Sequence, residues 1–168
     1  MTRRTVGLLL AAILFSTVSC GPRVDLATAL NVTEVFSGYY DFGIVNGLNK
    51  LVPSISFRLK NAASAPLTQV QLIVSFWQNG ADGDLDSKEV TGIGGTAVAP
   101  GASSDPILVR SATGYTIDQP RNELFTHHDF KDFTAKVFAK REGKIVPLGE
   151  FTIEHRVIPH TDEPPARP

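Results

Sequence analysis

The chain has 168 residues, of which 42% are hydrophobic and 20% charged, a composition typical of one globular domain that argues against global disorder. Its 16 basic and 17 acidic residues include no Lys/Arg-rich run, which argues against nucleic acid as a partner. The single cysteine excludes an internal disulfide framework and a cysteine-based zinc cluster, so stability must come from an apolar core.

The first 19 residues have the layout of an export signal. Arg3 and Arg4 give a positive start, and an almost unbroken apolar stretch of 13 residues runs from Val6 to Val18. This stretch is too short for a comfortable transmembrane helix. Residues 17–20, Thr-Val-Ser-Cys, resemble the lipobox of bacterial lipoproteins, although Thr stands where Leu is usual. The resemblance implies cleavage before Cys20 and a lipid on that cysteine. An ordinary cleaved signal with a chance cysteine is the alternative.

Residues 20–28 are predicted to be a lipidated tether between membrane and domain. Several acyl chains hold a protein firmly on a membrane, whereas one binds marginally. Gly21 stands where Asp would favour retention at the inner membrane. We therefore expect a lipid-anchored protein of the cell envelope, on the periplasmic side of the outer membrane.

Period-two hydrophobic patterns dominate residues 29–158, which we predict to be one domain. Residues 54–60 alternate apolar and polar side chains, as a half-buried strand does. Residues 69–77 become apolar on both faces, which favours a central strand. Weaker strands are predicted around 87–93 and 107–110, and residues 30–36 and 39–45 should add one or two more. Tyr39 and Tyr40 would face opposite sides of a strand, which leaves room for one of them to be exposed.

A hairpin is predicted near the C-terminus. Residues 133–140 alternate, and a turn containing Gly143 leads into a second arm over 145–157. Pro147 and Gly149 in that arm indicate an edge strand or a bulge. About seven short strands predict a single all-β, antiparallel, immunoglobulin-like sandwich. The Pro-rich residues 159–168 should form a disordered tail.

Three short motifs between Tyr40 and Val109 resemble the FxLYD-like domains of bacterial surface proteins. They are Phe57-Arg58-Leu59-Lys60-Asn61, Leu67-Thr68-Gln69-Val70-Gln71-Leu72, and Val74-Ser75-Phe76-Trp77 followed by a Gly/Asp turn, with Pro100-Gly101 later in the chain. The aromatic element departs from the Tyr-Asp form of the family. The resemblance implies an immunoglobulin-like sandwich without enzymatic chemistry of its own.

Asp82, Asp84 and Asp86 alternate along the chain, and carboxylates in that pattern can converge on calcium. The spacing does not match an EF-hand loop, which needs Gly at its sixth position and Glu at its twelfth, where Ser87 and Ile93 stand. The alternative is a polar hairpin loop that uses Asp and Gly for its turn geometry.

His127, His128 and Asp129 invite a metal-binding or acid–base interpretation. Adjacent strand residues point to opposite faces, so two neighbouring imidazoles rarely share one ion. We therefore expect a solvated loop here. His155 and His160 could join these residues only through tertiary contact.

Residues 111–125 form a long connection in which Tyr115 and Arg121 are the candidate binding residues, since Tyr and Arg are enriched at binding hot spots. The alternative is a crossover loop between two sheets. No Gly-x-Ser-x-Gly elbow or phosphate-binding loop occurs, so neither catalytic residues nor a cofactor is predicted.

The leading functional hypothesis is a non-enzymatic envelope lipoprotein that acts as a protein-interaction or assembly module, with another envelope protein as its partner. The second is a solute- or glycan-binding lipoprotein that uses the 111–125 loop. A third, a hydrolase, would need His127, Asp129 and His155 to converge within hydrogen-bond reach.

Overall fold

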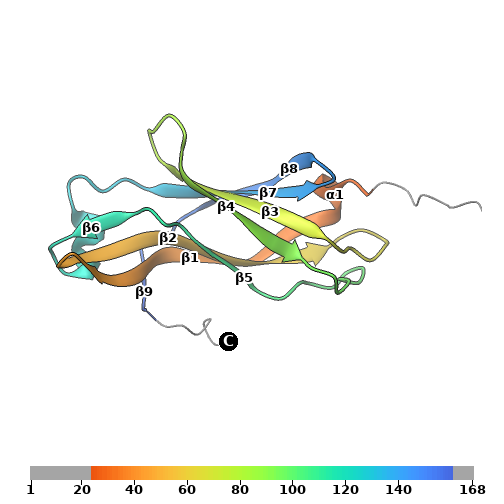
Figure 1. Ribbon diagram of the computed structural model, residues 1–168, viewed down its shortest axis with the longest axis horizontal. Helices are drawn as coiled ribbons and strands as arrows, with labels where there is room; N and C mark the ends of the chain where they lie inside the picture. The colour runs from red at the N-terminus through yellow and green to blue at the C-terminus, as the bar shows by residue number, and fades with distance from the viewer. Residues whose placement is uncertain (1–23, 161–168) are drawn as a thin grey trace, which may run out of the picture.

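Two sheets pack face to face around a common core (Figure 1). The computed structural model describes residues 24–160. One sheet has the order β5-β2-β1-β9, with β6 also paired to β2, and the other has the order β4-β3-β7-β8. The strands are β1 (Leu30–Val45), β2 (Leu48–Asn61), β3 (Val70–Gln78), β4 (Asp84–Ile93), β5 (Ile107–Arg110), β6 (Tyr115–Ile117), β7 (Phe133–Arg141), β8 (Lys144–Thr152) and β9 (Val157–Ile158). The predicted all-β sandwich is confirmed, with nine strands in the described residues instead of about seven.

β1 and β2 form one long hairpin. They have 16 and 14 residues, so the hairpin arms are about 45–50 Å long at the usual rise of a strand. Asn46 and Gly47 make the two-residue turn, with φ values of 51° and 81°, and Val45 pairs with Leu48 across it. Positive φ at both turn positions is the arrangement whose twist matches that of the strands. The register shifts near Glu34, whose φ is also 51°. The two predicted segments at 30–36 and 39–45 are therefore one bulged strand.

The second sheet follows the sequence pattern closely. β3 lies between β4 and β7, as its two apolar faces predicted. β7 and β8 form the predicted hairpin, and β8 is an edge strand. Its register against β7 shifts between Val137 and Phe138, opposite Gly149 and Pro147. The expected edge strand and bulge are both present.

The predicted second arm over residues 145–157 is wrong beyond Thr152. There the chain leaves β8 and crosses to the other sheet, where β9 pairs in parallel with Tyr39 and Tyr40 of β1. Ser37 guides this crossing, because its hydroxyl donates to the Thr152 carbonyl (2.9 Å) and accepts from the Glu154 amide (3.1 Å).

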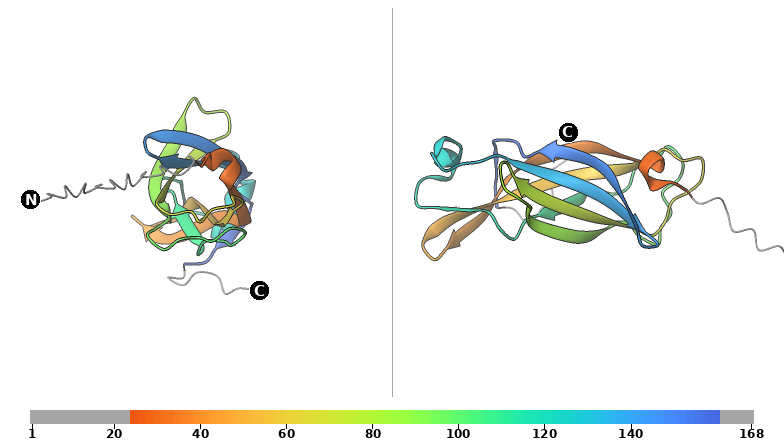
Figure 2. Two further views of the ribbon diagram at one scale, coloured as in Figure 1. Left: turned by 90° about the vertical axis from the view of Figure 1, so that its right-hand side faces the viewer. Right: turned by 90° about the horizontal axis from the view of Figure 1, so that it is seen from above.

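A four-residue helix, α1 (Leu26–Ala29), closes one end of the sandwich (Figures 1 and 2). Asp25 caps it by accepting a hydrogen bond from the Ala27 amide. Leu26 and Ala29 are buried in the core cluster. The folded unit therefore begins before residue 29, inside the segment predicted as tether.

Residues 1–23 and 161–168 lie outside the described part of the chain. The export signal, Cys20 and most of the predicted C-terminal tail fall there, so these expectations stay predictions. Among the described residues, no helix has the length and apolar character to cross a bilayer.

Candidate functional site

The end of the sandwich opposite α1 carries exposed apolar side chains. The β1–β2 hairpin projects there beside a 3₁₀ helix, η1 (Arg121–Thr126), and we call this region the distal end (Figures 1 and 2). Phe42, Ile44 and Leu48, in the hairpin tip (residues 42–48), are 50%, 70% and 36% exposed. The sequence analysis did not single out these residues. The Asn-Gly pair between apolar residues was the signal that could have found the tip.

A cleft with a volume of about 370 Å³ lies beside the hairpin tip. We call it the distal cleft. Most of its lining comes from the segment that joins the two sheets between β5 and β7. The lining residues are Leu48, Tyr115, Thr116, Ile117, Asp118, Gln119, Leu124, His127, Asp129 and Phe130.

Pairing with β2, which is distant in sequence, holds this connecting segment in place. β6 pairs with residues Asn49 to Leu51 of β2, and the Asn49 amide group donates to the Gln119 carbonyl at 2.9 Å. Gly114 precedes β6 and lies directly against β2: a Cβ there would be 2.8 Å from the Cα of Val52. Leu124 of η1 is buried. The segment crosses between sheets as the alternative interpretation expected, but it is ordered by its own strand and helix.

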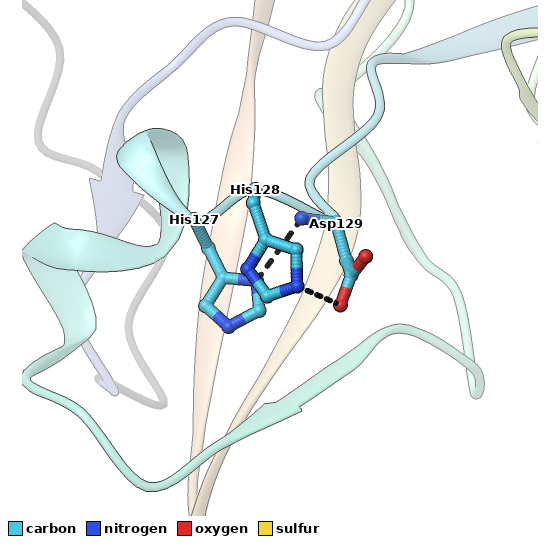
Figure 3. Close-up of side chains that lie close together, drawn as sticks. All are labelled: His127, His128 and Asp129. Atoms are coloured by element: carbon cyan, nitrogen blue, oxygen red, sulfur yellow. Dashed lines mark hydrogen bonds and ion pairs between the residues drawn. The ribbon is translucent and has the colours of Figure 1, made fainter.

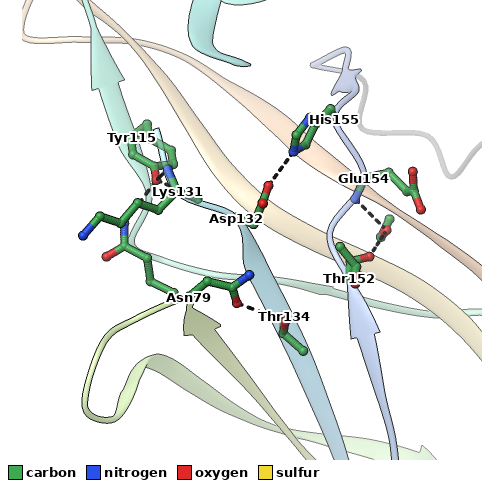
Figure 4. Close-up of polar contacts among 10 residues, drawn as sticks. Asn79, Tyr115, Lys131, Asp132, Thr134, Thr152, Glu154 and His155 are labelled. Carbon is green, nitrogen blue, oxygen red and sulfur yellow. Dashed lines mark hydrogen bonds and ion pairs between the residues drawn. The ribbon is translucent and has the colours of Figure 1, made fainter. Parts of the chain in front are cut away.

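Tyr115 lines the cleft, but its hydroxyl is engaged within the fold. It donates to the Lys131 carbonyl (2.8 Å) and accepts from the Lys131 amide (2.8 Å) and from the Gln78 side chain (3.1 Å). Figure 4 shows Tyr115 against Lys131. The side chain therefore ties the connecting segment to the start of β7. In the predicted binding role of Tyr115, only the aromatic ring would be available to contact a ligand.

Arg121 lies apart from the cleft lining. Its Nε is 2.5 Å from the Asp41 Oδ2, so it joins the start of η1 to β1. Asp41 Oδ1 also accepts a hydrogen bond from the Gly43 amide at 2.9 Å, which fixes the bulge there. The structure does not bring the two predicted binding residues, Tyr115 and Arg121, into one site.

Aromatic rings pack beneath the distal cleft. The Tyr39 ring contacts Phe125, Phe130, Phe133 and Tyr115, with centroids 5.4 to 6.4 Å apart. Burial raises the pKa of the Tyr39 hydroxyl far above its ordinary value, and the nearby Tyr115 hydroxyl adds to the effect. The Phe133 backbone acts to lower this pKa, but its effect is smaller than that of burial. The cleft therefore stands on a packed aromatic layer.

His127, His128 and Asp129 come together at the cleft wall (Figure 3). One ligand atom from each residue lies within 4.8 Å of the other two, and within residues 24–160 they are the one such group of three. The imidazole centroids are 4.5 Å apart with the planes tilted by 31°. These residues lie in a turn after η1, where the Phe130 amide donates to the His127 carbonyl. The opposite-face argument fails here because it assumed strand geometry.

His155 belongs to a different cluster. It lies 2.5 Å from Asp132 (Figure 4). Its ring also stacks on Phe125, with centroids 5.3 Å apart and an interplanar angle of 5°. His160 contacts the Tyr40 hydroxyl at 3.0 Å. His155 thus pairs with Asp132, and not with His127 or Asp129 as the hydrolase hypothesis required.

The predicted calcium ligands do not converge. Among the described residues, Asp82, Asp84 and Asp86 do not bring three oxygen ligands within 4.8 Å of one another. Asp86 instead accepts hydrogen bonds from the Ala112 amide (2.6 Å) and the Ser111 hydroxyl (3.0 Å). Burial acts to raise the pKa of Asp86, but these bonds and the neighbouring Lys88 outweigh it and lower the pKa. The carboxylate connects β4 to the chain after β5.

No known protein-family model and no curated protein sequence matches the chain. Solved structures resemble it at low identity. A candidate beta-galactosidase from Bacteroides fragilis has 12% identity and a TM-score of 0.44, over 74% of this chain and 17% of that one. An X-ray structure of a Northeast Structural Genomics Consortium target has 13% identity and a TM-score of 0.45, over 85% of this chain and 99% of that one. A candidate ApaA protein from Bordetella pertussis has 18% identity and a TM-score of 0.38, over 79% of this chain and 95% of that one. These TM-scores are all below 0.5, so none of these likenesses says what the site does.

Proposed function

We propose that this chain is a non-enzymatic lipoprotein of the cell envelope whose sandwich recognises another envelope protein through its distal end. The observation that carries the proposal is the exposed apolar hairpin tip, with Phe42, Ile44 and Leu48, at the end of the sandwich opposite α1. Apolar side chains left exposed at one end of a domain are typical of protein interaction sites. The FxLYD-like resemblance is compatible with this role.

The order of the chain supports this orientation. Cys20, the predicted lipid attachment point, comes shortly before α1 in the sequence. A lipid on Cys20 would hold the α1 end near the membrane surface, and the distal end would then face outward. We place the anchor on the periplasmic side of the outer membrane.

The partner we favour is an extended polypeptide segment with apolar side chains. β9 pairs only with Tyr39 and Tyr40, so among the described residues the last part of β1 is paired on its β2 side alone. A free strand edge can accept a further strand through main-chain hydrogen bonds, and side chains on alternate positions give specificity. Phe42 and Ile44 are the exposed side chains along this edge.

The anchor is tested by membrane fractionation of cells that produce Cys20→Ala. We expect the variant to leave the membrane fraction after a carbonate wash, while the unchanged chain stays. A variant that still partitions with membranes would refute the lipid anchor and leave the recognition proposal standing.

Recognition is tested separately by crosslinking in intact cells. Ile44→Glu places a charge at the distal end, and Ile145→Glu is the matched control. Ile145 is 52% exposed and lies near the start of β8 beside α1, at the other end of the sandwich. We expect Ile44→Glu to abolish a defined crosslinked adduct that Ile145→Glu keeps. Equal adducts in both variants would exclude the hairpin tip as the interface.

The volume of the distal cleft favours a second candidate function, the binding of a solute or glycan by the 111–125 connection. About 370 Å³ falls within the range of known small-molecule pockets. Gln119→Ala is the suitable test variant, because Tyr115 supports the fold. A sugar that raises the melting temperature of the unchanged chain but not of Gln119→Ala would support this function. No shift across a glycan panel would exclude it.

A further inference from the structure

We propose that His127, His128 and Asp129 bind a divalent transition-metal ion such as Zn²⁺ at the wall of the distal cleft. The three side chains offer two nitrogen ligands and one oxygen ligand, a donor set that suits zinc. This inference concerns the soluble domain alone and does not depend on membrane attachment.

The geometry of the three side chains is close to that of a metal site. Zinc bonds of about 2.0–2.1 Å place the ligand atoms of a tetrahedral site about 3.4 Å apart. The His128 Nε2 and the Asp129 Oδ2 are already 3.0 Å apart, and the three ligand atoms all lie within 4.8 Å of one another. Small rotations of the side chains would therefore complete the site.

The backbone of the turn is fixed, whereas the ligand side chains are free to adjust. The His127 amide donates to the Leu124 carbonyl at 3.1 Å, and the His127 carbonyl accepts from the Phe130 amide at 3.0 Å. His128 and Asp129 are 81% and 74% exposed, so their rotation disturbs no packing. Within the described part of the chain, the His127 Nδ1 accepts only one long hydrogen bond, 3.2 Å from the Asp129 amide, so this contact does not hold the ring firmly.

The site opens onto the distal cleft. His127 and Asp129 both line it, together with Asp118 and Gln119. Three protein ligands leave one position of a tetrahedral ion for a water molecule or for a donor atom of a bound molecule. A metal held here could thus take part in recognition at the distal end, with a carboxylate or imidazole of the partner as fourth ligand.

The test is a calorimetric titration of zinc chloride into the purified full chain, prepared without a polyhistidine tag. A Cys20→Ala background removes the sole thiol. We expect one zinc ion per chain. His128→Ala and Asp129→Asn should each weaken binding by at least about tenfold, because loss of even an outer-shell contact weakens metal sites by about 10- to 100-fold. Both positions are exposed, so folding should be retained.

Two controls make the result specific. His160→Ala removes an exposed histidine that contacts Tyr40 and should leave zinc affinity unchanged. Calcium should not compete, because it requires six to eight oxygen ligands. The proposal is overturned by the lack of saturable binding up to about 1 mM zinc, by unchanged affinity in His128→Ala, or by calcium competition at equal concentration.

Discussion

Tyr39 points into the core, and its neighbour Tyr40 points to the outer face of the same sheet, yet both are buried. Tyr40 is covered by the Arg110 guanidinium, 3.6 Å from its ring centroid, and by His160. The alternation of the strand predicts the opposite faces correctly. Neither tyrosine is exposed, because the covering groups come from distant parts of the chain that local periodicity does not reveal.

Tyr115 gives the first prediction. Tyr115→Phe removes the hydroxyl that joins Lys131 and Gln78, so we expect the free energy of unfolding to fall by about 1 kcal/mol, the usual value of such bonds when water can partly replace them. Urea unfolding followed by fluorescence measures it. Tyr40→Phe loses only its contact with His160 and should cost less. Equal losses in the two variants would contradict the anchoring role.

The sequence predicts where the candidate site lies better than it predicts what its side chains do. The segment 111–125 was recognised because a long connection on a sandwich often binds ligands, and it does line the distal cleft. Residue type alone suggests Tyr115 and Arg121 as binding residues. It does not reveal that the Tyr115 hydroxyl bonds to Lys131, or that the Arg121 guanidinium pairs with Asp41. A solvated loop is expected at His127 and His128, and they do lie in a turn; the argument that adjacent residues point to opposite faces does not apply to a turn.

At the scale of elements, strands with strong alternation were predictable and the shortest strands were not. Residues 54–60 lie within β2, and residues 69–77 lie within β3 except for residue 69; each strand buries a continuous apolar face. β6 and β9 have three and two residues, too few to show a period of two. Their pairing is determined by the strands they meet, which only the tertiary structure shows.

The close approach of Gly114 to β2 gives the second prediction. A Cβ at residue 114 would overlap the Leu51 carbonyl oxygen and crowd the Val52 Cα, so the backbone must shift. We expect Gly114→Ala to lower the free energy of unfolding by about 1–3 kcal/mol, as overpacking usually does. Gly95→Ala is the matched control, since nothing lies within 4 Å of a Cβ there. Thermal unfolding compares the two, and equal melting temperatures would contradict the close packing.

Asp86 gives the third prediction, because it joins β4 to the chain after β5. Its pKa is lower in the folded state than in the unfolded chain, so its stabilising effect is present above about pH 4, the ordinary Asp value, and is lost as the pH falls through the lowered pKa. Asp86→Asn should lower the free energy of unfolding by about 1 kcal/mol at pH 7.

The difference between Asp86→Asn and the unchanged chain should shrink below pH 4. Urea unfolding from pH 7 to pH 2.5 measures it. Asp82→Asn, at an exposed turn position, is the control and should show no such dependence. A constant difference over the whole range would mean that the Asp86 charge does not stabilise the fold.

At the scale of the whole molecule, the last residues complete both the core and the first sheet. Ile153 is fully buried, and β9 covers the middle of β1. We expect a chain that ends after Thr152 to lose cooperative unfolding, because exposing one buried Ile costs about 2–5 kcal/mol of a total near 5–15 kcal/mol. A chain ending after His160 keeps every described contact and is the control. Circular dichroism on heating distinguishes them, and a cooperative transition in the shorter chain would contradict the prediction.

The parallel pairing of β1 with β9 also has a kinetic consequence. Tyr39 and Val157 are neighbours in the sheet although they are 118 positions apart in sequence. Contacts between residues so far apart form late, because closing a long loop costs entropy before the contact can repay it. The first sheet therefore cannot be completed until residues 157 and 158 are available to pair with β1. In an exported chain, this delay would keep the first sheet incomplete, and the polypeptide able to pass through a narrow channel, until β9 has crossed the membrane.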